Sequence, residues 1–313
     1  MKTYILITLI TLSMSVQMMS FAQTDTTTVP EVVAPVPKDT IWRRGGTTGI
    51  NFSNVNLNNW SGGGQDAMSF TSLFLGTLDY KKKRMEWHNI LDVAYGFQRL
   101  GGKSAPFRKS DDRIYYQTRL SYDHSSKLRY TTLADFRSQF TEGYKYYPEN
   151  PDSSTLLSNF LAPAYITFSL GLEYLPVKNM SLFLSPASVK MTLMEDAYLS
   201  SIGAFGVPVG KRLRTEFGAS FVGRYKVDIG KTVSVATLLS LFNNYKNINV
   251  DVFWDVILYM KISKYLTTTF TTSLVYDDDI NVIRNNGTVG PAVQFKDVLA
   301  VGLVYKLNGY TVK

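Results

Sequence analysis

The sequence predicts an all-β fold, namely a transmembrane antiparallel β-barrel of about 12 strands with both termini on the periplasmic side. Three observations predict it. Apolar and polar residues alternate with a period of two through most of the chain after Gly45. The alternating stretches run for about a dozen residues, whereas soluble strands usually have about 5 or 6 residues and membrane-crossing strands need about 9 to 11. The connections alternate between short and long, as in bacterial outer-membrane barrels.

The N-terminal region predicts export. Lys2 gives a positive start, an apolar stretch follows, and Ser20-Phe21-Ala22 places small residues where a signal peptidase cleaves, so residues 1–22 are expected to be a Sec-type signal peptide. A transmembrane anchor is the alternative, which the short apolar run disfavours. Residues 23–44, rich in Thr, Val and Pro, are expected to form a flexible periplasmic linker, and residues 45–313 the barrel.

The composition excludes several classes of function. The chain has no Cys, so disulfide scaffolds, thiolate metal sites and cysteine nucleophiles are absent, and only two His are available for acid–base chemistry. The formal net charge of +8 comes from Lys and Arg scattered among aromatic residues rather than clustered in one tract. Nucleic acid is therefore not expected as a partner.

The alternation is clearest in residues 113–123, where the even positions are mostly apolar or aromatic and the odd positions are mostly charged or polar. Residues 164–174, 213–228 and 247–261 repeat this pattern. The predicted strand centres lie near residues 51, 73, 91, 117, 133, 170, 186, 220, 237, 254, 271 and 301. Short links are predicted at 80–83, 123–127, 175–179, 228–231 and 263–265, and the longest loops at 99–110, 141–162, 195–212 and 278–294.

The alternation also sorts side chains between a lumenal and a lipid-facing surface. The charged face has neither sign in excess, and Arg214 and Asp251 are expected to lie at similar depth and to meet. The predicted lumen-lining residues are Glu86, His88, Asp92, Arg119, Arg129, Asp135, Arg137, Glu173, Arg214, Glu216, Arg224, Asp251 and Asp255. The tyrosines expected at the lipid interface are Tyr80, Tyr122, Tyr174, Tyr225 and Tyr305.

Catalytic and metal-binding patterns are weak. Glu86, His88 and Asp92 share one strand face and are chemically suited to acid–base work or metal binding, but residues two apart on a strand lie about 7 Å apart and need help from another strand. A hydrogen-bonded lumenal histidine is the simpler interpretation. Residues 277–288 begin like a calcium loop, but Val282 replaces its Gly and Thr288 its Glu, which leaves at most a loose calcium site between outer loops. The sequence therefore predicts no catalytic residue, no metal site and no cofactor.

Two segments resemble a known family. The first hairpin, from Gly49-Ile50-Asn51-Phe52-Ser53 to Trp60-Ser61-Gly62-Gly63-Gly64, and the element Leu184-Ser185-Pro186-Ala187-Ser188 are similar to an uncharacterised outer-membrane family of Gram-negative bacteria, catalogued as a domain of unknown function. The resemblance extends in order of elements over about residues 40–310. It implies a β-barrel in the outer membrane and assigns no activity and no site residue. Pro186 itself predicts a bulge, because proline removes a donor from the strand ladder.

Together these features predict a non-enzymatic, porin-like barrel in the outer membrane of a Gram-negative bacterium. We expect a narrow passage for small polar solutes through a mixed-charge lumen, with outer-membrane lipid around it. The alternative is a sealed barrel that acts as a scaffold or accessory subunit of an outer-membrane secretion or assembly complex, because side chains are able to fill a ring of this size.

Overall fold

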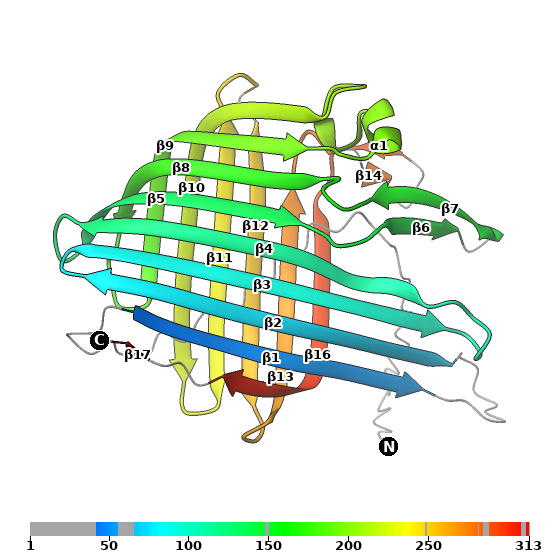
Figure 1. Cartoon of the computed structure of the whole chain (residues 1–313), viewed down its shortest axis with the longest axis horizontal. Helices are drawn as coiled ribbons and strands as arrows, with labels where there is room; N and C mark the ends of the chain where they lie inside the picture. The colour runs from blue at the N-terminus through cyan, green and yellow to red at the C-terminus, as the bar shows by residue number, and fades with distance from the viewer. Residues whose placement is uncertain are drawn as a thin grey trace, which may run out of the picture.

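The computed structural model describes residues 42–55, 66–147, 150–247, 249–280, 282–283, 288–307 and 311–312 (Figure 1). The predicted signal peptide, the linker up to residue 41 and the Trp60 loop lie outside these residues. The first strand begins at Trp42, earlier than the predicted barrel start at Gly45, because Trp42 pairs with Tyr80 and Arg43 with Asp79. Residues 42–44 therefore belong to the barrel rather than to the linker.

Twelve strands form one antiparallel sheet that closes on itself, since β16 pairs with β1 as well as with β13. Each predicted strand centre lies inside one of these strands, so the predicted barrel of about 12 strands is confirmed. The strands are β1 (Trp42–Val55), β2 (Ala67–Lys82), β3 (Met85–Leu100), β4 (Arg108–Asp123), β5 (Leu128–Ser138), β8 (Ala164–Tyr174), β9 (Met180–Leu193), β10 (Leu213–Ile229), β11 (Val233–Asn244), β12 (Val250–Lys261), β13 (Leu266–Tyr276) and β16 (Gln294–Leu307).

The two ends of the barrel differ. At one end, short turns join β2 to β3, β4 to β5, β8 to β9, β10 to β11 and β12 to β13. β1 starts and β16 ends at this same end, which we call the short-turn end. The strands from β1 to β9 cross the view in front of β10 to β16, which run in a different direction, as expected for tilted strands on opposite walls of a barrel (Figure 1).

The opposite end, which we call the loop end, carries the long connections. The connection from β5 to β8 contains a hairpin of β6 (Gly143–Tyr147) and β7 (Asn150–Ser158), and the one from β9 to β10 contains the helix α1 (Ala197–Ser201). Smaller strands are β14 (Val282–Ile283) and β15 (Val289–Gly290), which pair with each other, and β17 (Thr311–Val312), which pairs with β1. In the described part of the chain, no helix is long and apolar enough to cross a membrane.

The barrel is apolar outside and polar inside. Large apolar side chains such as Leu170 and Leu299 are 48% and 68% exposed on the outer face. Glu173 and Asp255, by contrast, are 0% and 1% exposed on the inner face. This distribution is the reverse of that in a soluble protein and is the arrangement of a transmembrane β-barrel.

The predicted bulge at Pro186 is confirmed. Gly218 of β10 pairs with Ser188, but Ser220 pairs with Ser185, so β9 has one residue more than its neighbour in this interval. On the other side, the Cβ of an alanine at position 171 would lie 2.1 Å from the carbonyl oxygen of Leu184. Only glycine fits opposite the bulge, and this fixes the register of β8 against β9.

The seam between β1 and β16 is the shortest contact in the barrel wall. Six residue pairs join these strands, from Gly46 and Leu307 to Asn51 and Gly302, whereas every other neighbouring pair of barrel strands has ten or more. The described residues of β1 and β16 beyond Asn51 and Gly302, toward the loop end, are not paired with each other. The barrel is therefore closed most firmly at its short-turn end.

Candidate lumenal site

The lumen is the only place where polar side chains gather in large number within the described part of the barrel. All thirteen predicted lumen-lining residues are buried or partly buried, and none of them lies on β9, where a bulge interrupts the alternation of inner and outer residues. They do not form one site. They are divided among a cluster at the short-turn end, a layer at mid-height and a pocket toward the loop end.

At the short-turn end the carboxylate of Glu173 is the centre of an ion-pair cluster. Arg119 Nη1 lies 2.9 Å from Glu173 Oε1, and the hydroxyls of Ser121 and Thr131 donate to Glu173 Oε2 at 3.4 Å. Arg129 Nη2 lies 3.0 Å from Glu86 Oε2, and Arg129 Nη1 lies 4.0 Å from Glu173 Oε2. Charges of both signs are therefore paired in this cluster.

His88, Glu86 and Asp92 pair with different residues: Asp79, Arg129 and Arg113. His88 pairs with Asp79 of β2, which in turn accepts from Arg43 Nη2 at 2.7 Å. Asp92 accepts from Arg113 Nη2 at 3.0 Å. These three residues lie on the same strand, and each pairs with a residue of another strand. A directly opposite residue on an adjacent strand is closer than the next inward-facing residue along the same strand.

At mid-height, opposite walls of the barrel touch. The guanidinium of Arg137 on β5 lies 5.1 Å from the ring centre of Phe253 on β12 and 5.3 Å from that of Tyr115 on β4. Arg137 Nε also lies 3.2 Å from Asp135 Oδ1. These contacts place cation–π and ionic interactions in the middle of the lumen.

Apolar side chains complete this layer. They point inward from five strands and are buried: Leu133, Phe183, Val222, Leu238 and Phe253, which we call the lumenal apolar cluster. The partly buried Val275 packs against it. Arg224 crosses the lumen nearby and donates to Gln117 Oε1 at 2.9 Å. The cluster and the two arginines therefore lie together in the lumen at mid-height.

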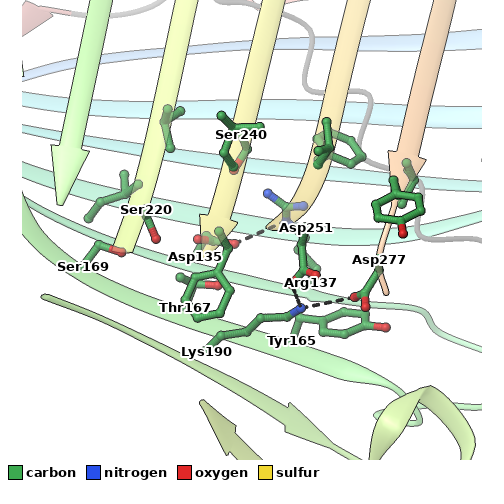
Figure 2. Close-up of a pocket in the computed structure, with 18 of the residues that line it drawn as sticks. Asp135, Arg137, Tyr165, Thr167, Ser169, Lys190, Ser220, Ser240, Asp251 and Asp277 are labelled. Carbon is green, nitrogen blue, oxygen red and sulfur yellow. Dashed lines mark hydrogen bonds and ion pairs between the residues drawn. The ribbon is translucent and has the colours of Figure 1, made fainter. Parts of the chain in front are cut away.

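A pocket of about 110 Å³ lies between this layer and the loop end. Lys190 of β9 binds two carboxylates there: its Nζ lies 2.7 Å from Asp251 Oδ2 and 3.2 Å from Asp277 Oδ2. Figure 2 shows Lys190 between these carboxylates, with the ring of Tyr165 beside it. Leu133, Val222 and Phe253 of the apolar cluster also line the pocket and form its side toward the short-turn end.

Arg214 does not meet Asp251, and this prediction was wrong. Arg214 Nη2 lies 2.7 Å from Glu216 Oε1 and also binds Asp279, which follows β13. In the register of the sheet, Asp251 pairs with Phe242 and Phe242 with Ser220, so Asp251 lies deeper in the barrel than Arg214. The predicted calcium loop contains Asp277, Asp279 and Asn281. Lys190 binds Asp277 and Arg214 binds Asp279, so both carboxylates are already paired with basic side chains of the protein. Asn281 lies outside the described residues.

Residues that hold the pocket together were missed by sequence reasoning. Lys190 lies beyond the bulge at Pro186, which interrupts the alternation that would have placed it inward. The alternation places Tyr165 and Phe253 on the inner face. Neither residue is charged, so the sequence did not indicate them as site residues. Among the described residues, no group of three or more His, Asp or Glu side chains is arranged to hold a metal ion.

The five predicted interface tyrosines lie toward the short-turn end. Tyr122, Tyr174, Tyr225 and Tyr305 are exposed on the outer face, and Tyr80 is partly covered by Trp42, whose ring centre lies 4.8 Å from its own. Trp87 lies beside the same pair, with its ring centre 6.1 Å from that of Trp42.

A family model described as "Protein of unknown function (DUF3078)" matches residues 52–144. The match confirms the resemblance to a family catalogued as a domain of unknown function, and the Ser185-Pro186 element lies beyond the matched range. The comparison with curated proteins gives no match.

Several solved structures are similar to this chain at low identity and low TM-score. The translocator domain of the autotransporter NalP from Neisseria meningitidis is 8% identical with a TM-score of 0.38, over 88% of this chain and 90% of that one. An outer-membrane channel from Pseudomonas putida F1 is 10% identical with a TM-score of 0.38, over 88% of this chain and 100% of that one. The toluene transporter TodX of P. putida is 12% identical with a TM-score of 0.33, over 87% and 91%.

Proposed function

We propose that the protein is an exported, non-enzymatic β-barrel of the outer membrane of a Gram-negative bacterium. The signal peptide is cleaved after Ala22, and residues 23–41 extend into the periplasm. The apolar outer face supports a lipid environment, with the short-turn end and both chain termini on the periplasmic side, as in other bacterial barrels. In this orientation the exposed tyrosines of the short-turn end form the inner interfacial girdle.

The function we propose is a narrow passage for small polar solutes. One observation carries it: in the same lumen, a pocket with charged groups of both signs borders directly on the lumenal apolar cluster. A polar solute finds hydrogen-bonding and ionic partners in the pocket. The apolar cluster then acts as the constriction, because apolar constrictions block ions and water until their side chains move apart.

Planar-bilayer recording of the purified protein tests this function. The expected result is small, intermittent conductance steps with weak ion selectivity, since both signs of charge line the lumen. Absence of any conductance above that of the protein-free bilayer, under conditions where the protein is inserted and folded, contradicts the proposal.

A sealed barrel that serves as a scaffold or accessory subunit of a secretion or assembly complex is the second candidate. The contact of Arg137 with both Tyr115 and Phe253 favours it, because this contact joins opposite walls of the barrel. Extraction in a mild detergent followed by affinity purification separates the two functions. A defined partner without solute flux supports the scaffold, whereas flux without a partner contradicts it.

The separate pairing of Glu86, His88 and Asp92 supports a role without catalysis. His88→Ala tests this point. The substitution removes the base nearest to any acid–base role, and we expect unchanged solute conductance in folded protein and unchanged lipid composition in the membrane of cells that produce it.

A further inference from the structure

The lumenal pocket contains polar atoms that no group among the described residues satisfies. The hydroxyl of Tyr165 and Oδ1 of Asp251 are both buried without a hydrogen-bond partner among the described residues. Tyr165 is only 9% exposed, and it lines the pocket together with Asp251. A buried polar atom without a partner destabilises a protein, so both atoms favour a ligand or water that binds them.

The chemistry of these two atoms defines the ligand. A carboxylate oxygen accepts hydrogen bonds and cannot donate, so Asp251 Oδ1 requires a donor. A tyrosine hydroxyl both donates and accepts and is compatible with the same group. The ligand must therefore carry at least one N–H or O–H donor.

The charges of the pocket favour a cation. The charged residues that line it are the carboxylates of Asp135, Asp251 and Asp277 and the basic groups of Arg137 and Lys190, which leaves one negative charge in excess. At the neighbouring rim, Arg214 is shared by Glu216 and Asp279, so this group also has one negative charge in excess. A monocation complements this field, whereas an anion would be repelled.

The remaining surface of the pocket is apolar. Val222, Phe242, Phe253 and Val275 line it. The ring of Phe242 already faces a cation, since Lys190 Nζ lies 5.6 Å from its centre. The volume of about 110 Å³ is smaller than the cavity of about 150 Å³ that holds benzene, so the pocket fits a body of about five non-hydrogen atoms.

From these observations we infer that the pocket binds a small organic cation, an ammonium head on a short apolar body, with Asp251 Oδ1 as the acceptor for its N–H. The inference rests on the proposed passage and names the class of solute that is held in it. Lys190 remains bound to Asp251 Oδ2 and Asp277, so the ligand uses the free oxygen and does not displace the lysine.

Titration calorimetry on the full chain in detergent micelles tests the inference, with n-butylammonium, n-butanol and butyrate as probes of equal length. We expect saturable binding of n-butylammonium and at least tenfold weaker binding of the other two probes. Equal binding of all three probes, tighter binding of butyrate, or no binding of n-butylammonium up to tens of millimolar overturns the inference. In the last case the two polar atoms are satisfied by water.

Two variants locate the site. Asp251→Asn replaces the acceptor and is expected to weaken n-butylammonium binding at least tenfold, whereas Asp228→Asn, whose side chain is 53% exposed at the short-turn end, leaves it unchanged. An equal affinity in Asp251→Asn and wild type overturns the assignment of Asp251. If Asp251→Asn does not fold, the probe comparison on the wild-type chain still decides the class of ligand.

Binding in micelles does not depend on transport. Binding of n-butylammonium without any conductance in bilayers refutes the proposed passage and leaves the cation site intact. Conductance without binding of this probe refutes the cation site and leaves the passage intact.

Discussion

The ammonium of Lys190 on β9 lies 3.2 Å from Oδ2 of Asp277, which directly follows β13. Three strands separate β9 from β13 in the sheet, so this ion pair crosses the lumen instead of following the wall. Lys190 also binds Asp251 on β12. One lysine thus joins three parts of the barrel that are distant in sequence.

Removal of this lysine is expected to weaken the barrel. Lys190→Met leaves Asp251 and Asp277 buried without their cation, and loss of one partner of a buried ion pair costs about 3 to 5 kcal/mol. Denaturant unfolding of the protein in lipid vesicles, followed by tryptophan fluorescence, measures the change. Lys81→Met is the matched control, because the Lys81 side chain is 42% exposed and its Nζ lies 3.7 Å from Glu86 Oε2, and we expect a loss of less than about 1 kcal/mol. Equal stability of both variants contradicts the role given to Lys190.

Gly171 is expected to tolerate no side chain. In Gly171→Ala the new Cβ meets backbone atoms of Leu184 and Ser185 at 2.1 and 2.7 Å, and backbone is unable to move without disturbing the bulge at Pro186. We expect a loss of about 1 to 3 kcal/mol in the same unfolding assay. Gly223→Ala is the control, since its nearest contact is a ring carbon of Phe221 at 3.3 Å. An unchanged midpoint for Gly171→Ala would show that the bulge is not formed as described.

The seam between β1 and β16 offers a test of barrel closure. The chain has no native Cys, so only the introduced cysteines are able to form a disulfide. Thr48 and Tyr305 are Cα partners, so Thr48→Cys with Tyr305→Cys is expected to form a disulfide, because cross-strand partners lie about 4.5 to 5.5 Å apart. Phe52→Cys with Val301→Cys continues the register beyond the last observed pair and is expected to cross-link poorly. Mobility on non-reducing gels measures both. Cross-linking only in the second pair would contradict the pairing of β1 with β16 described above.

Asp196 is the N-cap residue of α1, and the stability of this cap is expected to depend on pH. Asp196 Oδ1 accepts from the Leu199 amide at 2.9 Å and Oδ2 from Asn159 at 3.0 Å, and the hydrogen bond from Leu199 holds the pKa of Asp196 below 3.8. A lowered pKa stabilises the loop above pH 3.8 and loses this effect as the pH falls through the folded-state value. Asp196→Ala removes the cap at every pH, at a cost of about 1 kcal/mol.

Amide hydrogen exchange at Leu199 measures the cap. We expect lower protection in Asp196→Ala than in wild type at pH 6, and the same protection in both proteins at a pH well below 3.8. Asp278→Ala, on a different loop, is the control and should leave exchange at Leu199 unchanged. A difference between wild type and Asp196→Ala that persists at the lowest pH argues against titration of this cap.

The barrel could be predicted from the sequence, but the residues that meet in the site could not. A period of two fixes which face of a strand a residue occupies, and strands of 11 to 17 residues make the pattern long enough to count. The same period says nothing about which strands face each other across the lumen. Arg214 and Asp251 were therefore placed on the correct face but paired wrongly, since their relative depth depends on the stagger of β10, β11 and β12.

Lys190 and the loop elements were hidden for other physical reasons. The bulge at Pro186 shifts the alternation by one residue, so the sequence pattern does not predict on which face of β9 Lys190 lies. The hairpin of β6 and β7 and the helix α1 lie in stretches that were predicted as loops, because each is too short to show its own period.

Solute uptake into proteoliposomes containing Phe253→Ala tests the central claim most directly, that the lumen is a passage shut by the lumenal apolar cluster. Truncation of Phe253 removes the ring that contacts Arg137 across the lumen, so uptake of a small polar solute should rise several-fold over wild type. Phe270→Ala, which truncates an exposed ring on the outer face of β13, should leave uptake unchanged. Equal uptake by Phe253→Ala and wild type in folded, inserted protein would contradict the claim.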